Sequence, residues 1–203
     1  TLTLEERARF AGIIHDEAGR LTRLLDDLLD LSVLESGRAQ LSIGAANLHD
    51  LINRALSAAS ATRPERSFLI DRDVASEHVG VITDADRLLQ VLINVISNAR
   101  KYCDSDRPEL QIRVTRPAEG GTVIDIIDNG RGIEGSRQSL IFEKFARLND
   151  PARAGGAGLG LAICREIMTV LGGDIAYLPG LGGAAFRISL PQRPPAELRA
   201  AAG

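Results

Sequence analysis

The sequence predicts an α+β fold in which one long bundle-type helix precedes a two-layer sandwich, a mixed sheet covered by helices on one face. Three observations support this prediction. Residues 4–35 contain no proline and repeat apolar residues at helical spacing. After residue 39, short β-branched segments alternate with helical ones. Fourteen of the 20 glycines lie between Gly120 and Gly183, so tight turns and close backbone approaches are concentrated in the second half.

The first segment predicts a helix with an apolar seam that has no partner in the same segment. Ile14, Leu21 and Leu28 are seven residues apart, which is the spacing of a helical bundle or a coiled coil. A single helix cannot bury such a seam, so we expect a partner helix from elsewhere in the protein or from a second copy. Gly37 offers a left-handed cap, so the helix is expected to end at Ser36-Gly37.

A change of pattern near Arg38 predicts a domain boundary. It separates residues 1–38, a bundle-type helix, from a compact domain at 39–191, and residues 192–203 are predicted to be a disordered tail. Asn47 and Asp84 are predicted N-caps. In order, the patterns predict a strand at 40–43, a helix at 47–62, strands at 67–72 and 79–83, a helix at 84–101, strands at 110–115 and 122–127, a long functional loop at 132–156, a helix at 158–171, and strands at 174–178 and 185–190.

The composition argues against several functional classes. A formal net charge of -3 disfavours a large nucleic-acid surface, and an aromatic content of 3% disfavours base stacking. No run approaches the ~20 apolar residues of a membrane span, and no secretory signal is present, so we expect no membrane contact by this chain. Cys103 and Cys164 have no paired spacing and no nearby histidine, which argues against a zinc site.

Four clusters carry the chemistry, and the first is residues 94–102 on a predicted helix. Asn94 and Asn98 are four residues apart and therefore share a helix face. An amide oxygen is a suitable ligand for Mg²⁺. Lys101 could meet phosphate oxygens, and Tyr102 could lie against a flat ring. Taken alone, a polar helix face with a hydrogen-bonded amide pair explains the cluster more simply.

The second cluster is residues 128–132, directly after a predicted strand. A carboxylate such as Asp128 at a strand end can accept a hydrogen bond from an exocyclic amine, and glycines let the backbone approach a ligand. Taken alone, a plain Asp-Asn-Gly turn is the simpler interpretation.

The third cluster, residues 141–147, lies in the long loop. Phe142 and Phe145 favour a segment that docks and undocks against apolar surface, and local filling of the core explains them equally well.

The fourth cluster, residues 155–161, opens a predicted helix. Glycines and free N–H groups at a helix N-terminus can cradle an anion, although a flexible loop before a helix is the alternative. No Lys-Ser or Lys-Thr follows, so the cluster is not a P-loop. It also does not follow a strand in a βαβ unit, so the dinucleotide-binding fingerprint fails too.

In this order the clusters resemble the asparagine, first glycine, phenylalanine and second glycine boxes of the GHKL-type ATP-binding domain of bacterial sensor histidine kinases. Residues 28–38 resemble the end of the second helix of that family's dimerisation hairpin, and residues 172–173 and 180–186 resemble the domain's closing segment. The resemblance covers nearly all of residues 5–191. It implies a two-component protein histidine kinase that transfers the γ-phosphoryl group of Mg²⁺-bound ATP to a histidine, for relay to an aspartate of a response regulator receiver domain.

The resemblance also implies a role for each matching residue. Asn98 would ligate Mg²⁺, and Asn94 and Lys101 would complete the catalytic set beside the phosphates. Tyr102 would lie near adenine, and Asp128 would accept a hydrogen bond from the adenine amino group. The other nucleotide-binding residues implied, with a lid at 142–156, are Gly130, Gly132, Phe142, Phe145, Arg147, Gly156, Gly158, Leu159 and Gly160.

The acceptor histidine departs from the family pattern. The family's acceptor is followed at once by an acidic residue and, four positions after that, by proline. His15 is followed by Asp16, but Arg20 stands at the proline position, and His15 falls on the helix that resembles the second one. We therefore expect the chain to be a piece of a longer protein, with the acceptor upstream of Thr1, and to bind ATP without phosphorylating itself.

Two other functions stay open at this point. A GHKL-type ATPase would carry a glutamate base at the position of Asn94, and an amide cannot take a proton from water. A non-catalytic ATP-binding adaptor would keep the fold without an acceptor. In the full-length protein we expect a homodimer through the hairpin. We expect it to work in the cytoplasm, either free or as the cytoplasmic part of a membrane-anchored sensor.

Overall fold

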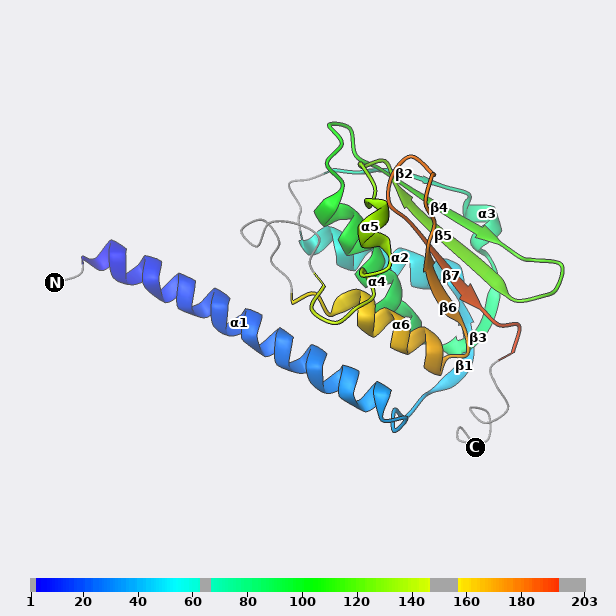
Figure 1. Cartoon of the computed structure of the whole chain (residues 1–203), viewed down its shortest axis with the longest axis horizontal. Coiled ribbons are helices and arrows are strands. Elements are labelled where there is room, and N and C mark those ends of the chain that lie inside the picture. Colours follow the sequence, from blue (N-terminus) through cyan, green and yellow to red (C-terminus); the bar gives the residue numbers. More distant parts are fainter. Residues whose placement is uncertain (1–2, 63–66, 147–156, 194–203) are drawn as a thin grey trace.

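The computed structural model describes residues 3–62, 67–146 and 157–193, and it places one long helix against a domain of helices packed on a sheet (Figure 1). The helices are α1 Leu4–Glu35, α2 Leu48–Thr62, α3 Val74–Glu77, α4 Ala85–Tyr102, α5 Gly135–Gln138 and α6 Gly160–Val170. The strands are β1 Ile43–Asn47, β2 Leu69–Arg72, β3 Gly80–Asp84, β4 Glu109–Thr115, β5 Thr122–Asp128, β6 Asp174–Tyr177 and β7 Ala185–Leu190.

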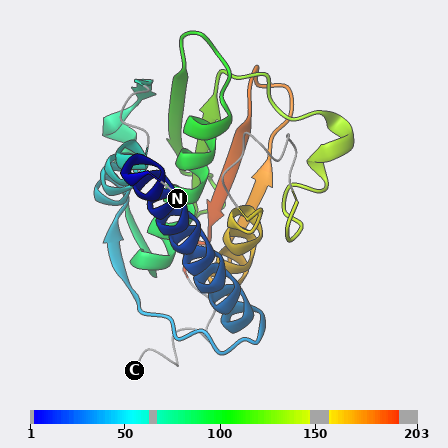
Figure 2. The ribbon, with the colours of Figure 1, turned by 90° about the vertical axis from the view of Figure 1, so that its left-hand side faces the viewer.

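Local capping sets both ends of α1. The Thr3 side chain accepts a hydrogen bond from the backbone N–H of Glu6, whose carboxylate accepts one from the N–H of Thr3, so two otherwise unpaired donors are satisfied. At the other end Gly37 adopts a φ of 67°, which confirms the predicted end of the helix. The C-terminal end of α1 packs on the domain, and its N-terminal part extends away from it (Figures 1 and 2).

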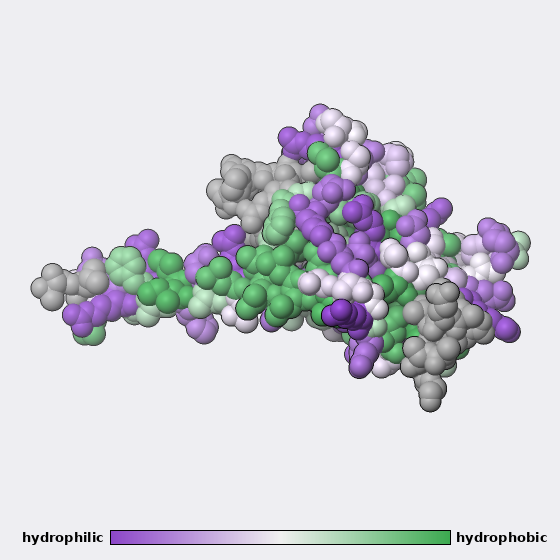
Figure 3. All heavy atoms as spheres, turned by 60° about the horizontal axis from the view of Figure 1, so that its bottom comes forward, coloured by the Kyte–Doolittle hydropathy of each residue, from purple (hydrophilic) through white to green (hydrophobic). Residues whose placement is uncertain are grey.

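The predicted apolar seam of α1 is largely uncovered. Ile14 and Leu21 are 69% and 63% exposed, and green apolar surface continues along the helix in Figure 3. The large apolar side chains exposed on α1 are Leu4, Phe10, Ile13, Ile14, Leu21, Leu25, Leu28, Leu29 and Val33. None of the helices in the described part of the chain combines the length and apolar character that crossing a membrane requires.

The main sheet is mixed, as predicted, with the strand order β2-β4-β5-β7-β6. β2 runs parallel to β4, and the other neighbours are antiparallel. Helices α2, α4 and α6 cover one face of it (Figure 1). The core lies between these layers, where the fully buried Leu92 and Ile96 of α4 join Ile112, Ile124 and other inward residues of the sheet. The α+β sandwich is therefore confirmed.

The other face of the sheet carries a row of alternating charges. Arg113 of β4 pairs with Asp71 of β2, and Arg187 of β7 donates two hydrogen bonds of 2.8 Å to Asp125 of β5. Asp125 is also the register partner of both Arg113 and Arg187. Cross-strand pairs of opposite charge stabilise a solvated sheet face, which explains why this sandwich has only two layers.

Asp84 fixes the start of α4. Its Oδ1 accepts hydrogen bonds from the N–H groups of Asp86 and Arg87, as the predicted N-cap requires, and its Oδ2 accepts one of 2.7 Å from the N–H of Ser42. A second, two-stranded sheet of β1 and β3 runs up to this point, with Ile43 opposite Asp84. The helix that carries the first polar cluster is thus anchored at its base.

Several predicted boundaries were wrong. The strand predicted at 40–43 lies instead at Ile43–Asn47, because its pairing with β3 outweighs the low strand propensity of Gly44 and the alanines that follow. The following helix begins at Leu48, and the side chain of Asn47 accepts a hydrogen bond from the N–H of His49. The short helices α3 and α5 were missed, the latter inside the segment expected to be irregular.

A buried carboxylate ties α2, α3 and β2 together away from the clusters. Glu77 is fully buried, and its carboxylate accepts hydrogen bonds from Arg72, one of them 2.8 Å from Nε, while His49 Nδ1 lies 3.2 Å from Oε2. Removing one partner from a buried ion pair leaves the other charge without compensation.

We therefore expect Glu77→Ala to lower the free energy of unfolding by about 3–5 kcal/mol, measured by urea denaturation. The matched control is Glu119→Ala at an exposed glutamate, which should change it by less than about 0.5 kcal/mol. Similar losses in the two variants would contradict a structural role for the buried pair.

Candidate functional site

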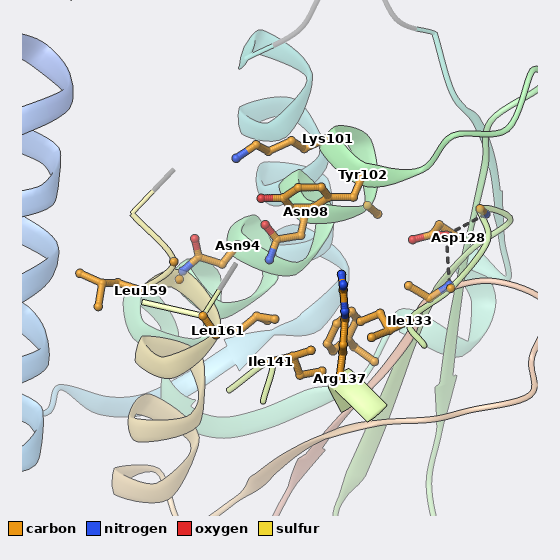
Figure 4. A pocket seen from close by; sticks show the side chains of 18 of the residues that line it. Asn94, Asn98, Lys101, Tyr102, Asp128, Ile133, Arg137, Ile141, Leu159 and Leu161 are labelled. Carbon is orange, nitrogen blue, oxygen red and sulfur yellow. Dashed lines mark hydrogen bonds between the residues drawn. The ribbon is translucent and has the colours of Figure 1, made fainter. Parts of the chain in front are cut away.

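A cavity of about 610 Å³ lies between α4, the end of β5, α5 and the start of α6 (Figure 4). Residues from all four sequence clusters line it, although the clusters are far apart in the chain. The predicted site residues in its wall are Asn94, Asn98, Lys101, Tyr102, Asp128, Gly130, Gly132, Gly158, Leu159 and Gly160.

Helix α4 supplies the first wall. Its buried face holds Leu92 and Ile96 against the core, which turns the opposite face and the end of the helix toward the cavity. Asn94 and Asn98 lie one turn apart on that face, as the spacing predicts (Figure 4). Lys101 Nζ lies 4.9 Å from the ring centroid of Tyr102, so a cation and an aromatic ring sit together at the end of α4.

The second wall is built around Asp128, the last residue of β5. Its Oδ1 accepts hydrogen bonds from the N–H groups of Gly130, at 2.8 Å, and Ala184, at 3.1 Å. Oδ2 receives no hydrogen bond from the described residues, and Figure 4 shows a carboxylate oxygen of Asp128 directed toward the cavity. One acceptor oxygen is therefore available to a ligand.

Burial raises the pKa of the Asp128 carboxyl above its ordinary value, since desolvation disfavours the charged form. The two backbone hydrogen bonds oppose this shift, and the negative charge of Asp104 adds to it. The side chain is only 6% exposed. Asp128 is thus a desolvated acceptor whose position is fixed by peptide groups rather than by a cation.

Two glycines allow the backbone to close around the cavity. A Cβ on Gly183 would lie 1.8 Å from the carbonyl oxygen of Asp128, so a side chain there would displace the strand end that carries the carboxylate. Gly158 has a φ of 75°, and a Cβ on it would lie 2.7 Å from the carbonyl oxygen of Ala146. Both positions require the absence of a side chain.

The start of α6 forms the third wall. Its N-cap residue, Leu159, makes no side-chain capping hydrogen bond. The first N–H groups of a helix have no partner within the helix and carry a partial positive charge. Gly160 and Leu161 line the cavity, and Gly160 would place a Cβ 3.4 Å from the Asn94 amide oxygen. This end of the cavity can therefore accept an anion beside the amides of α4.

The donor set fits a magnesium-bound purine nucleotide. Amide oxygens on α4 suit Mg²⁺, while Lys101 and an uncapped helix start suit phosphate groups. At the opposite side, the spare oxygen of Asp128 suits an exocyclic amine, and the rings of Tyr102 and Phe186 offer apolar contact. The volume of the cavity lies in the range of small-molecule sites.

The third cluster contributes Ile141 and Ala146 to the cavity wall, while its two phenylalanines lie beside the cavity. Phe142 is half-buried and packs edge-on against Phe186, with ring centroids 6.4 Å apart, while Phe145 is 57% exposed at a φ of 62°. Neither is among the residues that line the cavity. Arg147 and Gly156, the remaining predicted site residues, lie outside the described part of the chain.

Sequence reasoning missed several residues in the wall. Ile133 directly follows Gly132, and its N–H donates a hydrogen bond of 3.0 Å to the Tyr177 hydroxyl, so its place after the glycine turn was a usable signal. Arg137 of α5 and Asp27 of α1 also line the cavity (Figure 4 shows Arg137), and no local motif marks either of them.

The remaining polar candidates lie elsewhere. His15 is exposed on α1, on the same helix as Leu28, as expected. Among the described residues no group of three or more His, Cys, Asp or Glu side chains could hold a metal ion. Cys103 and Cys164 are both buried free thiols, and burial raises the pKa of Cys164 to about 12, so it is no nucleophile.

Comparisons with known proteins agree with this geometry. The model of the family "Histidine kinase-, DNA gyrase B-, and HSP90-like ATPase" matches residues 83–194. The sensor protein KdpD of Escherichia coli is 35% identical over 193 residues, which cover 94% of this chain and 21% of KdpD. The sensor protein kinase WalK of Staphylococcus aureus is 33% identical over 90% of this chain and 44% of its own length. The chain thus spans less than half of these relatives.

A solved structure extends the likeness to α1. The structure titled "Crystal structure of ShkA full-length in complex with AMPPNP" matches 97% of this chain and 41% of its own, with a TM-score of 0.78 and 26% identity. The matched family segment is more than half of the chain, and it contains every one of the described cavity residues predicted from the sequence. The chain therefore belongs to the histidine kinase-, DNA gyrase B- and HSP90-like ATPase family, as a sensor histidine kinase catalytic domain preceded by a long helix.

Proposed function

We propose that this chain binds Mg²⁺-bound ATP in the cavity and directs its γ-phosphoryl group to a histidine on another helix, for relay to an aspartate of a response regulator receiver domain. The observation that carries the proposal is the convergence of the α4 amides, the Asp128 carboxylate and the uncapped start of α6 on one cavity. The relatives named as a sensor protein and a sensor protein kinase, and the solved structure of ShkA in complex with AMPPNP, support it.

At one side of the cavity the residues would select the base. The spare oxygen of Asp128 would accept a hydrogen bond from the adenine amino group, which the carbonyl of a guanine at the same place cannot supply. Tyr102 and Ile133 would bound the flat ring. Since Asp128 is desolvated, losing this hydrogen bond leaves a buried acceptor unpaired, which makes the discrimination strong.

At the other side the residues would hold the phosphates. Asn98 would ligate Mg²⁺ through its amide oxygen, with Asn94 beside it, and Lys101 and the first N–H groups of α6 would bind phosphate oxygens. The bound nucleotide supplies the phosphoryl group, and the ion offsets its charge. The residues of this chain then contribute by orienting the triphosphate rather than by covalent chemistry.

Asn94 distinguishes this proposal from nucleotide hydrolysis. Asn94 lies on α4, in the cavity wall beside the start of α6. A hydrolysing enzyme of this fold would need a general base at this position. An amide cannot accept a proton from water, so the residue at this position favours transfer to an external acceptor.

The helical hairpin would carry the acceptor histidine and would form the contact between two copies. His15 lies on α1 together with the uncovered seam, and Arg20 occupies the position at which the family's acceptor motif has proline. We assign α1 to the second hairpin helix, so that Ile14, Leu21 and Leu25 pack in a helical bundle of two copies. A histidine on the first hairpin helix would then receive the phosphoryl group.

The direct test supplies this chain with γ-³²P-labelled ATP, Mg²⁺ and a separate hairpin that carries the family's acceptor motif. We expect label on the hairpin, and Asn98→Ala should lower the rate by at least about 100-fold because the ligand for the cation is lost. The matched control is Gln192→Ala, an exposed amide, with an unchanged rate. Bound ATP without transfer would instead identify an adaptor, and release of free phosphate would identify an ATPase.

A second prediction concerns pH. Because burial raises the pKa of Asp128, its carboxyl takes up a proton at higher pH than an exposed aspartate does. Protonated Oδ2 no longer accepts from the amino group, so the affinity for ATP is present above the raised pKa and is lost as pH falls through it. The measurement is the affinity for ATP of the chain and of Asp128→Asn, determined by calorimetric titration at each pH. Because proton uptake by ATP itself affects both proteins equally, it cancels in the ratio of the two affinities. A ratio of affinities that stays constant down to pH 4 would contradict the role.

A further inference from the structure

The end of α1 is held on the nucleotide-binding domain by charged and apolar contacts. Asp30 accepts hydrogen bonds from Arg87 Nη1 at 2.7 and 2.9 Å and from Gln90 Nε2 at 2.9 Å. Glu35 pairs with Lys144 at 2.5 Å. Leu31 and Leu34 are buried, and α1 packs beside α6 (Figures 2 and 4). This docking determines which α1 side chains face the cavity.

Asp27 is the α1 residue that reaches the cavity. It lies one turn before Asp30, on the same helix face as Leu24, Leu31 and Leu34, and it lines the cavity wall. The docking residues Arg87 and Gln90 precede Asn94 on α4, and α1 lies on the side of the cavity where α6 begins, opposite Asp128 (Figure 4). Asp27 therefore belongs to the side assigned to the phosphates.

Few favourable contacts offset the negative charge of the Asp27 carboxylate. It is half-buried and makes no hydrogen bond or ion pair with any described residue. Desolvation, followed by the carboxylates of Asp30 and Asp26, raises its pKa, and Arg23 opposes the shift. A negative charge that already costs free energy in the docked state costs more when another anion enters the same space.

We infer that Asp27 is a specificity-determining residue that α1 contributes to the nucleotide cavity, where its carboxylate disfavours a third phosphate while α1 is docked. The inference rests on the proposed function, because it assumes that the phosphates lie at the start of α6. By reciprocity of linked equilibria, binding of ATP then weakens the docking of α1, and binding of ADP weakens it less.

Equilibrium titrations of the chain with Mg²⁺-bound ATP and ADP, without any acceptor, test this assignment. Asp27→Asn should tighten ATP about fivefold and ADP less than about twofold, because the repulsion grows with the charge of the nucleotide. The matched control is Asp26→Asn, which makes the same charge change at an exposed neighbour outside the cavity wall and should leave the ATP-to-ADP ratio unchanged.

A second background isolates the part played by docking. Arg87→Ala with Lys144→Ala removes the two domain residues that form ion pairs with α1 in the described part of the chain, without altering α1. In this background ATP should bind more tightly than in the unaltered chain, and Asp27→Asn should add no further gain. Spin labels at exposed Arg9 and Glu119 give a readout independent of affinity, since ATP should lengthen and broaden their distance distribution more than ADP does.

The outcomes separate the inference from the proposed function. If neither nucleotide binds the unaltered chain, the proposed function fails. If both bind and Asp27→Asn leaves their ratio unchanged, or weakens ATP because the carboxylate helps to hold the cation, the inference is overturned while the proposed function stands. An undiminished effect of Asp27→Asn in the Arg87 and Lys144 background would overturn the role of docking.

Discussion

The hydrogen bonds that hold the Asp128 carboxylate at the end of β5 are the constraint on which the site depends. Two peptide N–H groups, of Gly130 and Ala184, fix one oxygen and leave the other facing the cavity. The geometry is possible only because Gly183 has no side chain, since a Cβ there would collide with the carbonyl of Asp128. A buried carboxylate held in this way needs no cation beside it, and its second oxygen stays open to the cavity.

The rest of the fold places a second set of groups opposite that carboxylate. α4 is anchored at its start by Asp84 and along its length by the core, so its amides project from a rigid element. The start of α6, which has no side-chain cap and carries glycine, lies next to these amides. The charge row lies on the sheet face that the helical layer does not cover. α1 docks on this layer from outside it, and it brings a carboxylate to the cavity wall.

Most of the fold could be predicted because periodicity and capping are local signals. The α1 limits, the Asp84 cap and the mixed sheet followed from apolar spacing and cap residues. β1 was misplaced because its strand exists only through pairing with β3, and α3 and α5 are single turns without a periodic pattern. Ten of the predicted site residues line one cavity, whereas Arg137 and Asp27 reach it through tertiary packing alone. Asp27 in particular depends on how α1 docks, which no spacing within the sequence encodes.

The central claim is that Asp128 and the start of α6 bind opposite ends of one nucleotide. A crystal structure of the chain with Mg²⁺ and a non-hydrolysable ATP analogue tests it most directly. The account predicts the adenine amino group within hydrogen-bonding distance of Asp128 Oδ2, the ion on the Asn98 amide oxygen, and the phosphates at the first N–H groups of α6. A nucleotide bound outside this cavity, or bound in it with its base at α6 and its phosphates at Asp128, would contradict the account.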